Sequence, residues 1–241
     1  MDVRTTVIDK RLKKIKRIIS VASGKGGVGK SLIATSFALT LTKKGYKVGL
    51  LDLDIYGPSS HIILGINDFS FPKEEKGIIP HELYGIKFMS IVYFSQDKPA
   101  ALRGTDITNV IIELLSITIW GELDFLIIDM PPGIGDETLD VIHLIKKSEF
   151  IVVTTPSKVA LGPVDKLLNI LNELKLPILG IIENMKNNNL TLIKDYTKEK
   201  DFKYLGRISY DWNLENSIGF TDKLMNTIFI KDFKKVVEKI I

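Results

Sequence analysis

Short apolar runs alternate along this chain with longer segments in which apolar positions recur at helical spacing. The short runs predict buried strands over 17–23, 47–54, 86–92, 123–129, 150–155, 178–182 and 204–208. The helical spacing predicts helices over 32–41, 106–119, 137–147, 163–175 and 231–240. Because strands alternate with helices, we expect an α/β fold with a mostly parallel sheet and helices on both faces. The pattern assigns nothing regular to 61–85.

The two ends of the chain carry less clear patterns. Residues 1–16 are polar and basic, and we expect a loosely held basic N-terminal arm before one domain over 17–241. The basic run 10–17 could contact anionic lipid or nucleic acid, but a solvated lead-in to the first strand is favoured. In 232–241 the apolar positions 233, 236, 237, 240 and 241 share one helical face, for which packing on the sheet is favoured over membrane binding.

Composition narrows the possible functions. The 33 basic and 29 acidic residues leave a net charge of +4, too mild by itself to indicate nucleic-acid or membrane binding. The chain has no cysteine, which excludes a disulfide, a thiolate metal site and a thiol nucleophile of its own. We expect no signal peptide, and no apolar run in the sequence approaches the roughly 20 residues of a membrane span. We therefore expect a cytoplasmic protein.

One segment fits the phosphate-binding pattern G-x-x-x-x-G-K-[ST] at every fixed position, and it lies between a predicted strand and a predicted helix. Glycines allow a tight turn that brings several backbone N–H groups to one anion, and the following helix adds its positive N-terminal end. The expected ATP-binding residues here are Gly24, Lys25, Gly26, Gly27, Val28, Gly29, Lys30, Ser31 and Leu32. Lys30 would contact the β- and γ-phosphates, and the Ser31 hydroxyl would bind Mg²⁺.

Acidic residues end two of the predicted strands, where ligands bind in open α/β sheets. Asp129 ends 123–129 and would hold Mg²⁺ directly or through water, while Gly133 would approach the γ-phosphate as part of a switch loop. Asp52 and Asp54 point to opposite faces if the strand stays extended, unless it ends between them. Asp54 is the better candidate for positioning an attacking water, and Asp52 could act on Ser31 and Mg²⁺; alternatively, one of the two only caps the turn.

These residues resemble the deviant Walker A ATPases, the class of MinD, ParA and the nitrogenase iron protein, in which Lys25 would be the additional signature lysine. Within that class the chain closely resembles the Mrp/ApbC iron–sulfur cluster carriers from about Ile18 to Ile218. The resemblance rests on 24–31, 52–59, Arg103-Gly104, 120–136, 154–156 and 180–185.

The resemblance implies a fold, partners and roles. Lys25 would reach across a two-fold homodimer to the partner's ATP, Asp54 would activate water, and Asp129 would be the Walker B acid. Asn184 would hydrogen-bond adenine, because an amide can donate to and accept from a base edge. Two ATP molecules would lie between the subunits, so slow hydrolysis would control dimer opening.

Two departures from the family pattern limit what carries over. Cluster carriers have a Cys-x-x-Cys pair shortly after the Glu-Asn-Met segment, whereas this chain reads Lys-Asn-Asn-Asn-Leu-Thr-Leu-Ile over 186–193. Because clusters are held by Cys thiolates, we expect no iron–sulfur cluster on this chain's own residues. The family's Ile-Pro is also replaced by Ile208-Ser209, next to the expected adenine pocket.

Three functional hypotheses remain open. The first is a Mg²⁺-dependent dimeric ATPase of the Mrp/ApbC type. The second is a nucleotide-gated interaction module that acts on a client protein or a cysteine-bearing partner. The third is a spatial organiser like MinD or ParA, although membrane and nucleic acid are not expected partners.

Overall fold

The computed structural model describes residues 3–96, 104–187 and 190–241, which form a sheet in the order β3-β4-β2-β5-β1-β6-β7-β8. All neighbouring strands run parallel except β3 and β4. The strands are β1 Ile15–Ser23, β2 Val48–Asp52, β3 His81–Leu83, β4 Ile86–Ser90, β5 Leu123–Asp129, β6 Ser148–Thr154, β7 Ile178–Lys186 and β8 Tyr204–Ser209. The predicted α/β fold with a mostly parallel sheet is confirmed.

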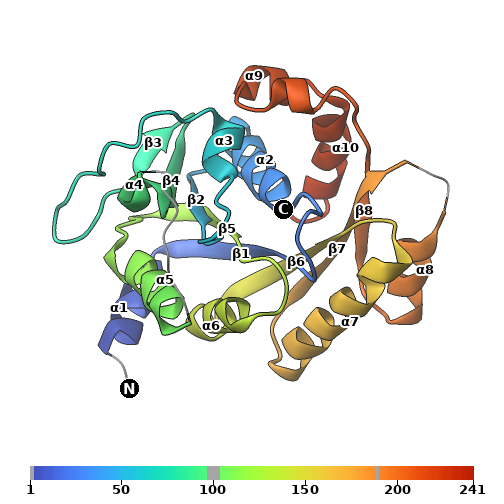
Figure 1. The fold of residues 1–241 in the computed structure, drawn as a ribbon, viewed down its shortest axis with the longest axis horizontal. Helices are drawn as coiled ribbons and strands as arrows, with labels where there is room; N and C mark the ends of the chain where they lie inside the picture. Colours follow the sequence, from blue (N-terminus) through green and yellow to red (C-terminus); the bar gives the residue numbers. More distant parts are fainter. Residues whose placement is uncertain (1–2, 97–103, 188–189) are drawn as a thin grey trace.

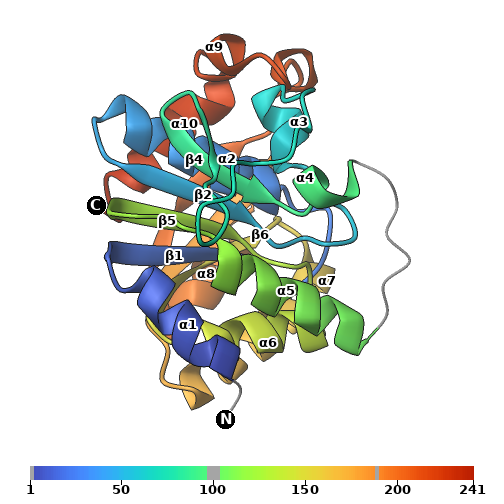
Figure 2. The ribbon, with the colours of Figure 1, turned by 90° about the vertical axis from the view of Figure 1, so that its left-hand side faces the viewer.

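Helices cover both faces of this sheet (Figures 1 and 2). One face carries α2 and α10, and the other carries α1, α5, α6 and α7. The helices are α1 Val3–Leu12, α2 Lys30–Lys43, α3 Ser60–Leu64, α4 Val92–Ser95, α5 Thr105–Ile117, α6 Asp136–Leu144, α7 Lys158–Glu173, α8 Leu192–Glu199, η1 Glu215–Ser217, α9 Thr221–Leu224 and α10 Ile228–Val237. Each helix predicted from the apolar pattern is present, with ends that differ by a few residues. The unassigned segment 61–85 contains most of α3 and the short edge strand β3.

The prediction of a loosely held arm over 1–16 is wrong for residues 3–12, which form α1 against α5. Ile8 and Leu12, one turn apart on α1, are 1% and 4% exposed. The Arg11 guanidinium donates hydrogen bonds to the carbonyls of Ser116 and Lys76. The segment has four apolar residues at helical spacing, Val3, Val7, Ile8 and Leu12, but its polar and basic composition favoured a loose arm in the sequence analysis. Tertiary contacts stabilise this short helix.

The sequence favoured a solvated lead-in over 10–17, but two of its basic residues form ion pairs within the protein. Arg17 forms a bidentate ion pair with Glu149, with N···O distances of 2.7 and 3.0 Å. Lys16 lies 2.7 Å from Asp124 on the neighbouring strand. These partners neutralise charges that an anionic surface would otherwise contact.

The apolar face near the C-terminus packs inside the protein, as favoured from the sequence. Phe233, Val236 and Val237 are buried, and α10 packs on β8 and α2. Phe37 of α2 meets the ring of Phe233 edge-on at a centroid distance of 5.9 Å. No helix in the described part of the chain has both the length and the apolarity needed to cross a bilayer.

Strand order and register place the predicted functional residues together. β1 lies between β5 and β6, and β5 lies between β1 and β2. The register pairs Asp52 directly with Asp129, and the backbone N–H of Leu53 donates to the Asp129 carbonyl at 2.9 Å. The segment 24–29, which follows β1, therefore begins beside the two strand ends that carry the acids.

If α1 is a docked helix, removing its main apolar contact will destabilise the protein. We expect Ile8→Ala to lower the free energy of unfolding by about 2–5 kcal/mol, because it leaves a cavity under α1. Lys10→Ala, on the exposed side of the same helix, will change it by less than about 0.5 kcal/mol. Urea unfolding followed by circular dichroism measures both variants; equal stabilities would contradict the docking of α1.

Candidate nucleotide-binding site

A tight loop connects β1 to α2 and has the shape expected for phosphate binding. Gly27 and Gly29 adopt φ angles of +75° and +82°, which a side chain would strain. Gly24 lies so close to α7 that a Cβ atom there would be 2.5 Å from the carbonyl carbon of Pro163. Strand, loop and helix thus follow one another as predicted, with the backbone N–H groups of the first turn of α2 at the loop's end.

Asn184 holds this loop from β7. Its side-chain amide donates to the carbonyl of Val28 at 2.9 Å, and only 2% of the residue is exposed. A Cβ on Gly29 would lie 2.4 Å from Asn184 Nδ2, so glycine is required for this close approach. The structure places Asn184 against the loop, and its contact with adenine stays a prediction.

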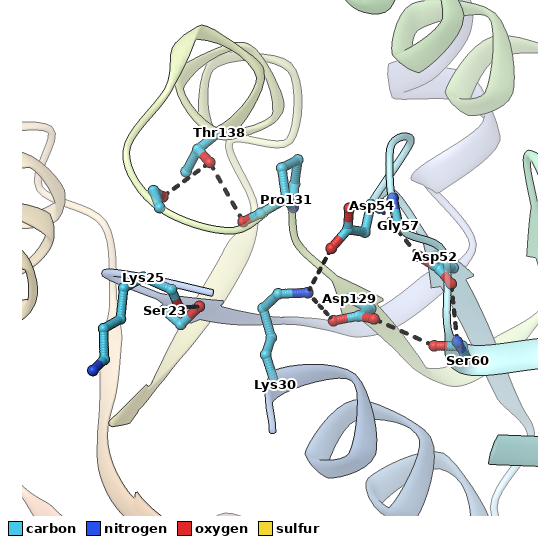
Figure 3. Close-up of polar contacts among 11 residues, drawn as sticks. Ser23, Lys25, Lys30, Asp52, Asp54, Gly57, Ser60, Asp129, Pro131 and Thr138 are labelled. Atoms are coloured by element: carbon cyan, nitrogen blue, oxygen red, sulfur yellow. Dashed lines mark hydrogen bonds and ion pairs between the residues drawn. The ribbon is translucent and has the colours of Figure 1, made fainter. Parts of the chain in front are cut away.

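The centre of the site is a buried ion pair behind the loop (Figure 3). Lys30 Nζ lies 2.5 Å from Asp129 Oδ1 and 3.8 Å from Asp54 Oδ2. Lys30 is 6% exposed and Asp129 is fully buried. A buried ammonium and carboxylate require each other, because removing either leaves an uncompensated charge.

Asp52 adds a second buried carboxylate beside this pair. It accepts hydrogen bonds from the backbone N–H groups of Asp54 and Ser60 at 3.1 and 3.2 Å. Burial, reinforced by the neighbouring Asp129, raises the pKa of Asp52 to about 8, and the Lys30 ammonium opposes this rise. Two buried carboxyl groups therefore lie beside one buried ammonium, and the raised pKa keeps Asp52 largely protonated near neutral pH.

Asp54 lies beyond the end of β2, so it is not bound to the alternation of the strand. The strand ends at Asp52, and Asp54 accepts the Gly57 N–H at 3.1 Å. Of the two arrangements considered from the sequence, the strand thus ends between the two acids. Burial raises the pKa of Asp54, whose side chain is 14% exposed.

The segment after Asp129 runs beside the phosphate loop. The Gly133 N–H donates to the Ser23 carbonyl at 3.1 Å, and its φ angle is +80°. The Thr138 hydroxyl donates to the Gly133 carbonyl at 3.1 Å (Figure 3). Gly133 is thus linked on one side to the end of β1 and on the other to the start of α6.

The remaining predicted residues are placed differently. Lys25 directs its side chain away from the Lys30–Asp129 pair (Figure 3), while its carbonyl accepts the Ser23 hydroxyl at 2.9 Å. Ser31 is the second residue of α2, and Leu32 packs against the core. The structure brings together Lys30, Asp52, Asp54 and Asp129, and it does not bring Lys25 into that group.

Ser60 was missed by the sequence analysis, which gave it no role. Its hydroxyl donates to Asp129 Oδ2 at 3.3 Å, and its N–H donates to Asp52. The only available signal was a serine shortly after a strand that ends in acids. Arg103, part of the resemblance, and Asn188 and Asn189 of the 186–193 segment lie outside the described residues.

Comparison with known proteins agrees with this geometry. Residues 14–241 match the ParA family, described as NUBPL iron-transfer P-loop NTPase. The iron–sulfur cluster carrier protein of Aquifex aeolicus is 44% identical over 73% of this chain, which spans about half (49%) of that relative's length. The carrier of Methanococcus maripaludis is 38% identical over 100% of this chain and 90% of its own length.

A solved structure shows the same fold. The nucleotide-binding protein of Archaeoglobus fulgidus, in complex with ADP, is 31% identical, with a TM-score of 0.78 over 92% of this chain and 93% of its own. These findings confirm the resemblance to Mrp/ApbC proteins. The chain belongs to the ParA/NUBPL family of iron-transfer P-loop NTPases.

Proposed function

We propose that this protein is a Mg²⁺-dependent, slowly hydrolysing ATPase that works as a homodimer, and that its nucleotide state controls contact with a partner holding the iron–sulfur cargo. The observation that carries the ATPase proposal is the buried Lys30–Asp129 pair directly behind the phosphate loop. The ADP complex of the related Archaeoglobus protein supports the nucleotide.

The ion pair gives Lys30 two alternative partners. Without nucleotide, its ammonium neutralises Asp129. A triphosphate in the loop presents a larger negative charge, so Lys30 would turn toward the β- and γ-phosphates and release Asp129. The same side chain would then stabilise charge that develops on the phosphates during hydrolysis.

The residues that would hold Mg²⁺ in this proposal are all oxygen donors. The donors are the hydroxyl of Ser31 and the carboxylates of Asp129 and Asp52, all of them hard oxygen ligands of the kind that Mg²⁺ prefers. Burial, with Asp129 beside it, raises the pKa of Asp52 to about 8, so a further positive charge would be needed to keep this carboxylate ionised near neutral pH. When bound, the metal would supply that charge and neutralise phosphate oxygens.

In this proposal Asp54 activates the water that attacks the γ-phosphate. It is the acid of the group that keeps some exposure, and burial raises its pKa, which favours proton acceptance. Gly133 would sense the γ-phosphate through its N–H, which now bonds the Ser23 carbonyl. Asn184 would contact adenine; because its amide holds Val28, base binding would be coupled to the loop conformation.

The cargo must be held by other thiolates. The curated relatives are iron–sulfur cluster carriers, yet this chain has no cysteine. Clusters are held by Cys thiolates, so a client or cysteine-bearing partner would supply them. The apolar face of α10 is buried inside the protein, so it is not available for a MinD-like membrane contact.

The first test is Lys30→Ala. We expect ATP turnover to fall by about 10²–10³-fold or more, because the variant loses the cation that stabilises the phosphates. Lys43→Ala removes the same charge from the exposed end of α2 and will retain full turnover. Phosphate release is the measurement, with Lys30→Arg as a second variant that keeps a cation against Asp129. Unimpaired hydrolysis by both Lys30 variants would overturn the assignment.

The second test concerns Lys25, which points away from the local cluster. If it reaches the partner's ATP, Lys25→Ala will bind ATP within a few-fold of the parent chain but will not dimerise with a non-hydrolysable analogue. Light scattering after size exclusion measures the mass, and titration calorimetry measures binding. A variant that still dimerises and hydrolyses ATP would rule out the trans role.

The third test asks whether the chain alone can carry a cluster. After reconstitution with iron and sulfide we expect no stable cluster absorbance on the purified protein, since it offers no thiolate. The Aquifex relative treated in parallel is the positive control. A stable cluster on the isolated chain would contradict the need for a partner.

A further inference from the structure

A pocket of about 530 Å³ lies at the outer end of the sheet, away from the phosphate loop. Its walls come from the end of β7, from α8, from the edge strand β8 and from α10. β8 is separated from β1 by β6 and β7, so the pocket lies apart from the phosphate loop (Figure 1). Its lining includes Ser209, next to the expected adenine position, so the test below is made with the nucleotide site filled. We call it the β8 pocket, and its volume is typical of sites for small molecules.

The β8 pocket concentrates positive charge. Two carboxylates, Glu183 and Asp232, face five cations from four different elements: Lys186, Lys194, Arg207, Lys235 and Lys239. The surplus of three positive charges compares with a net charge of +4 for the whole chain. Cations gathered around a shared cleft raise the local positive potential and attract anions.

Both carboxylates are already occupied by protein groups. Glu183 accepts a hydrogen bond from Lys186 at 2.7 Å and another from the Tyr204 hydroxyl at 2.7 Å. Asp232 accepts from the N–H and hydroxyl of Ser209 at 3.2 and 2.8 Å, and from Lys235 at 3.0 Å. Neither is free to neutralise the other cations of the pocket.

Lys194 and Arg207 therefore lack a counter-charge. Both are exposed, and within the described residues neither has an ion-pair partner. A guanidinium binds phosphate through two parallel N–H donors, and a lysine adds a mobile charge. Together they match a phosphate group better than a neutral ligand.

Two main-chain groups of β8 are already bonded to side chains, which favours a compact ligand over an extended peptide. Lys239 Nζ donates to the Leu205 carbonyl at 2.6 Å, and Asp232 accepts the Ser209 N–H. An added strand needs these main-chain groups. We propose that the β8 pocket binds a small phosphate-bearing anion, a second ligand site separate from the ATP site.

Titration calorimetry with sodium pyrophosphate tests this site. The protein is first saturated with ADP in EDTA, so that the phosphate loop is filled and its occupancy is measured independently. We expect one pyrophosphate to bind per chain, and Lys194→Ala/Arg207→Ala to weaken it at least ~10-fold by removing two charged donors. ADP affinity will not change in this variant.

The matched control removes the same charge from the same neighbourhood. Lys198→Ala/Lys231→Ala changes one exposed lysine on α8 and one on α10, neither of which lines the pocket. It will bind pyrophosphate like the parent chain. No binding to the ADP-loaded protein, or equal weakening in both double variants, would overturn the proposal, as would tighter binding of hexaglutamate than of pyrophosphate.

Discussion

The buried contact between Lys30 and Asp129 organises the site described here. It joins the first turn of α2 to the end of β5, and so it ties the phosphate loop to the strand beside it. Because each charge is buried, each would be costly without the other. A nucleotide that offers Lys30 a stronger partner would therefore change the state of Asp129 as well, which links phosphate binding to the acids.

The other residues of the site depend on where that pair lies. The β2–β5 register sets Asp52 opposite Asp129, and Ser60 bridges the two carboxylates through its N–H and hydroxyl. Burial beside Asp129 raises the pKa of Asp52 to about 8, so this carboxyl is largely protonated near neutral pH in the ligand-free protein. A divalent cation bound here would favour the ionised carboxylate in place of that proton.

β7 contributes residues both to the phosphate loop region and to the β8 pocket. Its Asn184 holds the phosphate loop, and the preceding Glu183 forms the floor of the β8 pocket with Lys186 and Tyr204. Glu183 and Asn184 are adjacent and point to opposite sides of β7. The alternation is then broken by Met185, whose φ angle is +57°, and by a register shift between Glu183 and Lys186, so Lys186 joins Glu183 in the pocket. From the resemblance, a Cys-x-x-Cys pair would be expected in the segment that begins at Lys186. In this chain the segment has no cysteine and begins with the buried ion pair between Lys186 and Glu183.

The sequence by itself determined the parallel α/β fold, the phosphate loop and the acids at the strand ends, because apolar periodicity and short motifs are local properties of the chain. It also established that no thiolate exists for a cluster. Only the tertiary structure decided that Lys30 pairs with Asp129, that Ser60 joins the acids and that residues 3–12 dock as a helix. The β8 pocket likewise assembles cations from β7, α8, β8 and the C-terminal segment around α10. These features depend on register and on long-range packing, which no local pattern encodes.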